Sequence, residues 1–270
     1  MTGANSPAPR RARVRGIGSR WLLLLLWVGA PAWAVPGQPS PPAATAQRSA
    51  VYTWASPSSP DGTGKFYQGR EIARVMSHQG AWWLERPERE REEQPAKVVA
   101  ALELRPGMWV ADLGAGTGYY TRRLAKAVQP GGRVFAVDVQ PEMLDILRER
   151  ADQAGLTNIV TVLATEKDPR LPKERLDLVV MVDVYHELLW PHEVLEAVRE
   201  SLKPGGRVAF VEYRAEDPAV PIKPLHKMTE AQVRREAAVH GFEWIRTVDT
   251  LPWQHLILFR RPAEKEVRAP

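Results

Sequence analysis

The sequence predicts a single α/β domain built on a mostly parallel sheet. The first indication is the alternation of short apolar segments with amphipathic ones from about residue 109 onward, because strands separated by helices pair in parallel. The second is a glycine-rich turn that follows an apolar segment and opens an amphipathic one, which is where an open α/β sheet binds a ligand. The length of 270 residues leaves room for one such domain with extensions.

Residues 1–34 have the three parts of a secretory signal peptide. A basic stretch is followed by an apolar run from Trp21 to Ala30 and by the small-residue site Ala32-Trp33-Ala34. The apolar run is shorter than the roughly 20 residues that cross a bilayer. We therefore expect cleavage near Ala34 and an exported protein, periplasmic or secreted, without a stable membrane span. An N-terminally anchored or a cytoplasmic protein are the alternatives.

The net charge also depends on this N-terminus. Five of the 37 basic residues precede residue 35, where no acidic residue occurs, so the remaining chain has 32 basic and 32 acidic residues. A neutral chain exerts no overall attraction on phosphate backbones, and we expect no nucleic-acid partner. Because the chain has no cysteine, it forms neither disulfides nor thiolate metal sites.

Residues 35–64 are rich in Pro, Ser and Ala and predict a linker before a domain at 65–262, which is followed by a tail at 263–270. Ile72, Val75 and Met76 have helical spacing and predict a helix at the start of the domain. We expect strands at 109–113, 133–139, 159–163, 176–182, 207–213, 243–248 and 255–259. We expect helices at 96–104, 121–128, 141–153, 192–202 and from a capping box at Thr229 to about Gly241.

The glycine turn carries the main functional signal. Dinucleotide-binding folds need glycines two and five residues after the first, but here glycines occupy positions 114, 116 and 118, and Tyr119 stands at the fifth. Asp112 precedes the turn and suits a ligand with an ammonium group better than a pyrophosphate. Asp138 ends the next strand, where its carboxylate could accept hydrogen bonds from both ribose hydroxyls. A plain turn and a helix cap at Asp138 are the structural alternative.

This pattern resembles motif I of class I S-adenosylmethionine-dependent methyltransferases, and the likeness covers about residues 96–260. Segments 176–183 and 202–208 resemble later motifs of the small-molecule and quinone-biosynthesis branch. The resemblance implies a Rossmann-like seven-stranded sheet with an antiparallel last strand and helices on both faces. It also implies that S-adenosylmethionine is the cofactor and that Asp112, Gly114, Gly116, Gly118, Asp138, Glu166 and Asp183 bind it. Asp168 competes with Glu166 for the place near the adenine.

The acceptor is predicted to be a small organic molecule, although no motif indicates its identity or an oligomeric state. Methyl transfer needs chiefly alignment of donor and acceptor, and a base only if the acceptor holds a proton. Tyr185 and His186 follow the fourth predicted strand of the parallel series, and His186 is the candidate base, with structural packing as the equal alternative. His78 and Trp82 are candidate acceptor contacts from a helical lid.

Two further expectations concern charged residues. The run from Glu85 to Glu93 is expected to be a solvated face, and no Asp/His pair has ligand spacing, so we assign no metal.

Two rival functions stay open: a noncatalytic exported nucleoside-binding protein with a methyltransferase-like fold, and an NAD-dependent oxidoreductase. Export also raises a supply problem, because the cofactor is made in the cytoplasm.

Overall fold

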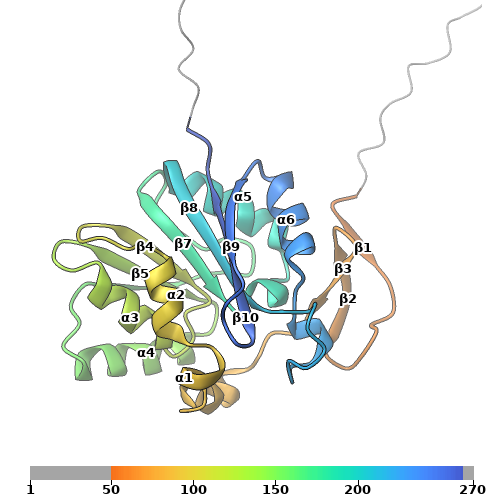
Figure 1. The fold of residues 1–270 in the computed structure, drawn as a ribbon, viewed down its shortest axis with the longest axis horizontal. Helices are drawn as coiled ribbons and strands as arrows, with labels where there is room; N and C mark the ends of the chain where they lie inside the picture. The colour runs from red at the N-terminus through yellow and green to blue at the C-terminus, as the bar shows by residue number, and fades with distance from the viewer. Residues whose placement is uncertain (1–49, 264–270) are drawn as a thin grey trace, which may run out of the picture. The chain divides into compact units, whose positions relative to one another are not determined.

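The computed structural model describes residues 50–263. The predicted signal peptide, residues 35–49 of the linker and residues 264–270 of the tail lie outside the described residues. Two sheets are present in the described part of the chain, a small antiparallel one and a large one of seven strands (Figure 1). Among residues 50–263, no helix is both long and apolar enough to cross a membrane.

The large sheet has the strand order β6-β5-β4-β7-β8-β10-β9. Its strands are β4 (Trp109–Leu113), β5 (Arg133–Asp138), β6 (Ile159–Leu163), β7 (Leu176–Val182), β8 (Leu202–Tyr213), β9 (Glu243–Val248) and β10 (Gln254–Arg260). Strand β10 runs antiparallel to both of its neighbours, whereas β4 to β8 pair in parallel. The predicted fold class is therefore confirmed, including the antiparallel last strand.

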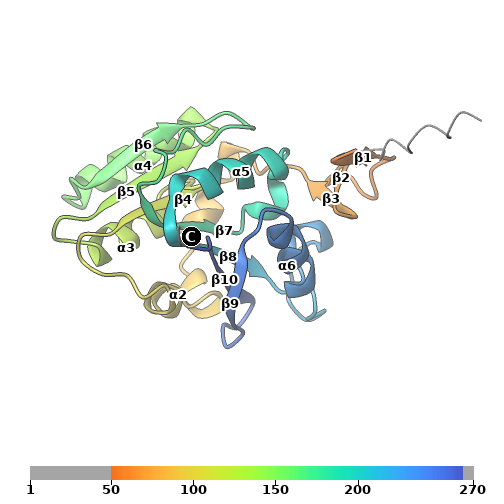
Figure 2. The same cartoon turned by 90° about the horizontal axis from the view of Figure 1, so that it is seen from above.

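Helices cover both faces of this sheet (Figure 2). They are α1 (Arg89–Glu92), α2 (Pro95–Ala101), α3 (Tyr119–Ala127), α4 (Pro141–Gln153), α5 (Pro191–Ser201) and α6 (Glu230–Val239). Side chains alternate between the two faces of a strand, so Val110 packs with α2 and α3 while Ala111 packs in the core that includes α5 and α6. The predicted cap of α6 is present, because the Thr229 hydroxyl accepts the Gln232 N–H.

The region before β4 differs from the prediction. Instead of a linker up to residue 64 and a helix around Ile72, the chain forms an antiparallel sheet of β1 (Tyr52–Trp54), β2 (Gly62–Tyr67) and β3 (Arg70–Ala73). Gln68 and Gly69 both have positive φ, the backbone of a two-residue hairpin turn. The helical spacing that includes Val75 is coincidental, because Ile72 is buried in a strand and Val75 is 55% exposed.

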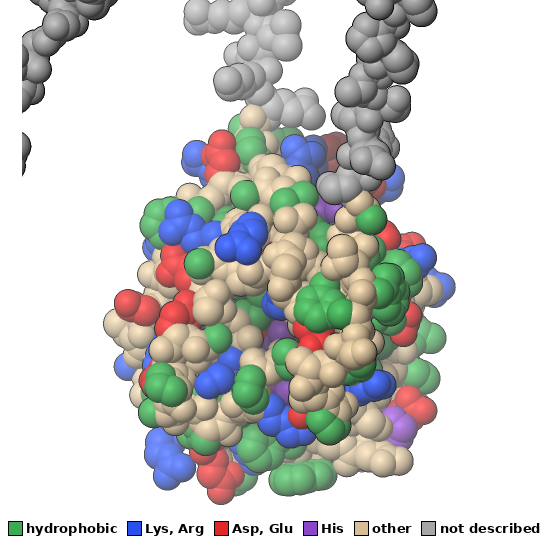
Figure 3. Space-filling model, turned by 90° about the vertical axis from the view of Figure 1, so that its right-hand side faces the viewer, with side chains coloured by type: hydrophobic (Ala, Val, Ile, Leu, Met, Phe, Trp, Pro, Cys, Tyr) green, Lys and Arg blue, Asp and Glu red, His purple; other side chains and the backbone are tan. Residues whose placement is uncertain are grey.

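Three short 3-10 helices complete the described chain: η1 (His78–Glu85), η2 (Tyr185–Glu187) and η3 (Pro224–His226). The face of the molecule shown in Figure 3 carries basic and acidic side chains interspersed with apolar ones. The candidate functional site is a cavity over the carboxyl ends of the parallel strands β4, β5 and β7.

Candidate functional site

A cavity of about 430 Å³ lies over the carboxyl ends of β4, β5 and β7. Its floor is the turn after β4, and its walls come from the segments that follow β5, β6 and β7. Residues 73–76, together with Leu84 and Arg89, contribute from the region before β4. The cavity thus occupies the position where open α/β sheets bind ligands.

The turn after β4 needs glycine for steric reasons. Gly114 has φ 76°, and a Cβ there would lie 2.3 Å from Cγ2 of Val184; Gly116 has φ 52°, and its Cβ would lie 2.7 Å from Cδ1 of Leu84. Both residues line the cavity. Gly118 does not line it, and a Cβ there would meet Leu147 of α4. Gly118 thus allows close packing of the turn against α4, and its contact with the cofactor stays a prediction.

The glycine turn and the acid at the end of β5 meet, as the sequence predicts. Oδ2 of Asp138 accepts the Gly116 N–H at 2.8 Å, and Oδ1 accepts the Gln140 N–H at 2.9 Å. Asp138 is 8% exposed and lines the cavity. Burial raises its pKa, although these backbone N–H groups oppose the shift.

Two more aspartates end neighbouring strands at the cavity. Asp112 is buried, accepts the Thr121 hydroxyl at 2.6 Å, and has its pKa raised to about 6, first by burial and then by Asp138. Both carboxylate oxygens of Asp183 accept hydrogen bonds from Nε2 of Gln254, at 2.9 and 2.7 Å. Burial, together with Glu93, raises the pKa of Asp183 well above its usual value.

The cavity is predominantly acidic. Its charged lining consists of five carboxylates and two guanidinium groups: Asp112, Asp138, Glu166, Asp183, Glu187, Arg74 and Arg89. A buried surface with excess negative charge stabilises a cationic ligand and repels a pyrophosphate. The electrostatics therefore oppose a dinucleotide in this position.

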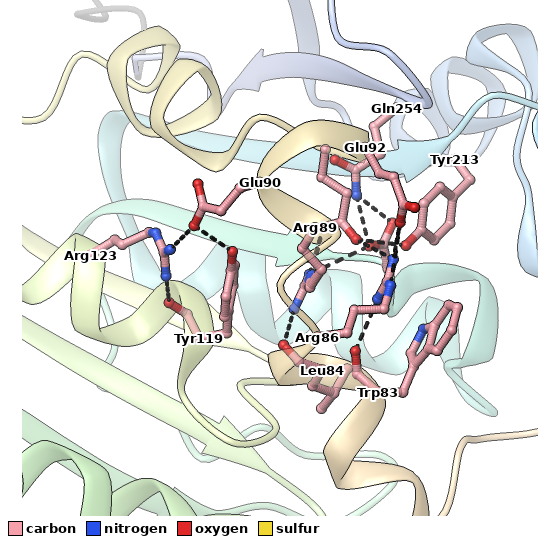
Figure 4. A network of polar contacts seen from close by, with 12 residues as sticks. Trp83, Leu84, Arg86, Arg89, Glu90, Glu92, Tyr119, Arg123, Tyr213 and Gln254 are labelled. Carbon is pink, nitrogen blue, oxygen red and sulfur yellow. Dashed lines mark hydrogen bonds and ion pairs between the residues drawn. The ribbon is translucent and has the colours of Figure 1, made fainter.

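The segment from Glu85 to Glu93 is solvated only in part, whereas its composition predicts a wholly solvated face (Figure 4). Arg89 and Glu93 are 4% and 0% exposed, and Nε of Arg89 donates to Glu93 at 2.8 Å. Arg89 also donates to the Leu84 carbonyl at 2.8 Å and lies 3.9 Å from Asp183. Four charged side chains of the run are buried because they pair with one another and with the sheet, namely those of Arg86, Arg89, Glu92 and Glu93, whereas Glu88, Glu90 and Arg91 stay exposed.

Glu93 is the centre of this network. Oε1 accepts hydrogen bonds from Arg86 at 3.0 Å and from the Tyr213 hydroxyl at 2.9 Å, while Oε2 accepts from Arg89. Tyr213 belongs to β8, 120 residues away in the sequence. Because Leu84 and Arg89 line the cavity, the network fixes one wall of the site to the sheet.

The structure does not place Tyr185 and His186 in the cavity lining, in contrast to the predicted catalytic roles. The Tyr185 hydroxyl donates to Glu236 at 2.7 Å, and Nδ1 of His186 lies 2.6 Å from Glu212. Burial alone would lower the pKa of His186, but Glu212 and Glu187 together outweigh it and raise the pKa to about 10. A buried, protonated imidazole cannot accept a proton from an acceptor, so His186 is a poor candidate base.

The predicted acceptor contacts His78 and Trp82 are also outside the cavity lining. Trp82 is 70% exposed on η1, and His78 uses its backbone N–H to contact Gln140 at 2.8 Å. Helical spacing was assumed for a segment that forms a 3-10 helix, so the predicted directions of these side chains do not hold. Of the two candidates near the adenine, Glu166 lines the cavity and Asp168 does not.

Glu187 lines the cavity, although within the triplet Tyr185-His186-Glu187 the sequence favours its two neighbours as the catalytic candidates. One carboxylate oxygen accepts the Met76 N–H at 3.1 Å. Burial would raise its pKa, but His186 and His226 lower it to about 2. The triplet Tyr185-His186-Glu187 was the available signal, and the fold turns its third side chain, rather than its second, toward the cavity.

Comparison with known proteins defines the class. Residues 110–206 match the family described as "Methyltransferase domain". The chain is 34% identical over 118 residues to "Ubiquinone/menaquinone biosynthesis C-methyltransferase UbiE" of Burkholderia vietnamiensis. The aligned segment covers 44% of this chain and 48% of that protein. A protein of the same name from Bordetella avium is 32% identical over 127 residues, 47% of this chain and 49% of the relative. The chain thus spans about half the length of these curated relatives.

Solved structures extend the likeness beyond the family match. A "SAM dependent methyltransferase" from Aquifex aeolicus has 27% identity and a TM-score of 0.66, covering 69% of this chain and 99% of that one. The "[4+2]-Cyclase SpnF" shares the fold at 16% identity, with a TM-score of 0.55 and coverage of 63% and 80%. Residues 110–206 therefore match a methyltransferase domain, and the fold is similar to that of an S-adenosylmethionine-dependent methyltransferase, as the motifs predict. Because a cyclase shares the fold, the particular reaction has to be argued from the site.

Proposed function

We propose that the protein transfers a methyl group from S-adenosylmethionine to a small organic acceptor. The observation that carries the proposal is the hydrogen bond between Gly116 and Asp138, which places the glycine turn and the carboxylate together in an acidic cavity. The cofactor supplies an electrophilic methyl group on a positively charged sulfur. Its sulfonium and ammonium charges match the excess of carboxylates in the lining.

The residues of the cavity fit the parts of this cofactor. Asp112 suits the ammonium group, since its carboxylate is buried and has a single hydrogen-bond donor in Thr121. Asp138 suits the ribose hydroxyls, and Glu166 suits the adenine amino group. Gly114 and Gly116 leave backbone accessible where side chains would obstruct a ligand.

The acceptor end of the cavity is proposed to be the apolar part. Val75, Met76, Leu188 and Leu189 line it on the side of β3 and η2. Such a wall favours a largely apolar acceptor and excludes water from the methyl group. If the acceptor holds a proton, Asp183 is the better base in place of His186, because Asp183 lines the cavity and His186 does not.

Calorimetric titration tests the proposal. The purified protein is expected to bind S-adenosylmethionine at one site and NADH not measurably, because pyrophosphate would meet the aspartates of the cavity. Transfer of label from methyl-labelled cofactor to an envelope extract, followed by mass spectrometry, would then identify the acceptor. A folded protein that binds NADH but no S-adenosylmethionine would overturn the assignment; one that binds the cofactor without any transfer would support the noncatalytic alternative.

Cofactor binding is expected to weaken below about pH 6. Asp112 loses its charge there, and a protonated carboxyl no longer attracts an ammonium group. The folded state should instead become more stable as the pH falls through this range, because a carboxyl pKa raised above its unfolded value means that protonation favours the folded state. Asp112→Asn should therefore bind the cofactor weakly at every pH and melt at a higher temperature than the wild type at pH 8. Calorimetry and thermal melts from pH 5 to 8 measure both; identical pH profiles for the two proteins would contradict the role of Asp112.

We also propose that the protein is exported and cleaved near Ala34, which depends only on the pattern of residues 1–34. Sequencing the N-terminus of the native protein tests this, with Val35 as the expected first residue. An intact Met1 would instead favour a domain that stays where the cofactor is made.

A further inference from the structure

Two histidines and a glutamate converge beside the cavity. His186 and Glu187 belong to η2, and His226 ends η3, 40 residues further along the chain. Nε2 of His186 lies 3.2 Å from Nδ1 of His226 and 3.7 Å from Oε1 of Glu187, and the latter two atoms are 3.2 Å apart. Three atoms with lone pairs therefore form a compact triangle.

The triangle has the dimensions of a transition-metal site. Zn²⁺ binds imidazole nitrogen and carboxylate oxygen at about 2.0–2.2 Å, and a tetrahedral arrangement then separates the ligand atoms by about 3.4 Å. The three observed separations, 3.2, 3.2 and 3.7 Å, bracket that value. Two imidazoles and one carboxylate with a further position open is a usual ligand set for catalytic zinc.

The surroundings orient each ligand. Nδ1 of His186 faces Glu212 at 2.6 Å, so its proton lies on that side and the Nε2 lone pair is directed into the triangle. Glu187 is oriented in the same way, with one oxygen bound by the backbone and the other free for the metal. Oε2 accepts the Met76 N–H at 3.1 Å, and Oε1 belongs to the triangle. A carboxylate behind a histidine ligand is the common support of metal-bound imidazole.

Charge balance also favours a cation. A metal ion binds neutral imidazole and so replaces the proton that His186 carries without it. With both imidazoles neutral, Glu187 and Glu212 place two negative charges in a buried region, since their side chains are 10% and 0% exposed. Arg70 contacts only the backbone carbonyl of His186, at 3.1 Å, and its guanidinium group is paired with Glu236. A divalent ion in the triangle would neutralise the two carboxylates, and uncompensated buried charge is costly.

A second cluster of the same composition has a more exposed carboxylate, and a hydroxyl rather than a carboxylate faces the outer nitrogen of its buried histidine. It consists of His192, Glu196 and His240. Both ring nitrogens of His240 have partners, the Tyr67 hydroxyl at 2.9 Å and Glu196 at 2.7 Å, and the Glu196 side chain is 53% exposed. This cluster is explained by hydrogen bonding within the fold and provides an internal control.

We propose that His186, Glu187 and His226 bind one divalent transition-metal ion of the Zn²⁺ or Co²⁺ class, with Glu212 supporting His186. The ion joins η2 to η3, and through Glu187 it supports the backbone at Met76, which lines the cavity. Imidazole ligands select this class of metal over Mg²⁺ and Ca²⁺. The spacing of histidines and acids in the sequence predicts no metal, because His226 lies 40 residues from His186 and is brought to it only by the fold. The proposal does not depend on the identity of the methyl acceptor.

The test is a Co²⁺ titration of the full chain, prepared without a polyhistidine tag and stripped with a chelator. We expect one equivalent of Co²⁺ to produce the visible absorption of a four- or five-coordinate ion, and Zn²⁺ to displace it. His226→Gln and Glu187→Gln should weaken binding at least 100-fold. Glu212→Gln should keep the stoichiometry and weaken binding about 10- to 100-fold.

Matched controls separate this site from adventitious binding. His78→Gln replaces another partly exposed histidine, and Glu196→Gln alters the second cluster; both should bind Co²⁺ like the wild type. His226 is partly exposed, so His226→Gln is expected to fold, and Zn²⁺ should raise the melting temperature of the wild type but not of this variant. Folded wild-type protein that binds no Co²⁺ at 10-fold molar excess, or binding that His226→Gln leaves unchanged, would overturn the proposal.

Discussion

Replacing Asp138 with alanine is expected to weaken S-adenosylmethionine binding about 100-fold or more. In the proposed complex the carboxylate accepts two ribose hydroxyl hydrogens, and each hydrogen bond to a charged group contributes about 1.5–3 kcal/mol. Losing both corresponds to about 3 kcal/mol or more, and 1.4 kcal/mol is a factor of about ten in Kd. Calorimetric titration of the variant with the cofactor measures the change.

The control for Asp138→Ala is Asp168→Ala, which removes a carboxylate from a residue outside the cavity lining. The cofactor affinity of Asp168→Ala should stay within about twofold of the wild type. The affinity of Glu166→Gln should lie between those of Asp168→Ala and Asp138→Ala, because this change affects a single contact. Asp138 also holds the Gly116 N–H, so circular dichroism must show that the variant is folded. A folded Asp138→Ala protein with wild-type affinity would remove the central support for the proposed function.

The sheet was predictable because most of its strands are short, apolar and bounded by turn residues. The limits expected for β4, β6, β7 and β9 agree with the structure, and α4 also has its expected bounds. The meeting of Gly116 with Asp138 followed from topology, because the carboxyl ends of adjacent parallel strands lie at one edge of the sheet. Those parts depend on local patterns and on a rule of chain topology.

The wall of the cavity was not predictable for a different reason. Arg89 and Glu93 are charged, and composition alone assigns charged residues to the surface. Their burial depends on partners such as Tyr213, which a local pattern cannot reveal. The side-chain directions at η2 were unpredictable for the same reason. The sequence correctly predicts that the segment after β7 reaches the site, but Glu187 rather than His186 lines the cavity.

Replacing Glu93 with glutamine is expected to destabilise the fold by about 3–5 kcal/mol, the usual cost of removing one partner from a buried ion pair. Two guanidinium groups, those of Arg86 and Arg89, share this carboxylate, so the variant would leave both inadequately compensated in a buried region. For a domain of this size the melting temperature should fall by about 6–20 °C. Urea and thermal unfolding measure the effect.

Glu90→Gln is the matched control for Glu93→Gln, because it makes the same chemical change three residues earlier, in the helix α1 that Glu93 caps. Glu90 is also paired, with Arg123 and the Tyr119 hydroxyl, but its side chain is 58% exposed, and exposed pairs contribute about 0–1 kcal/mol. If both variants lose the same small amount of stability, the network does not hold the cavity wall. If only Glu93→Gln is destabilised and its cofactor affinity also falls, the buried pairs that fix Leu84 and Arg89 shape the binding site as well as stabilise the fold.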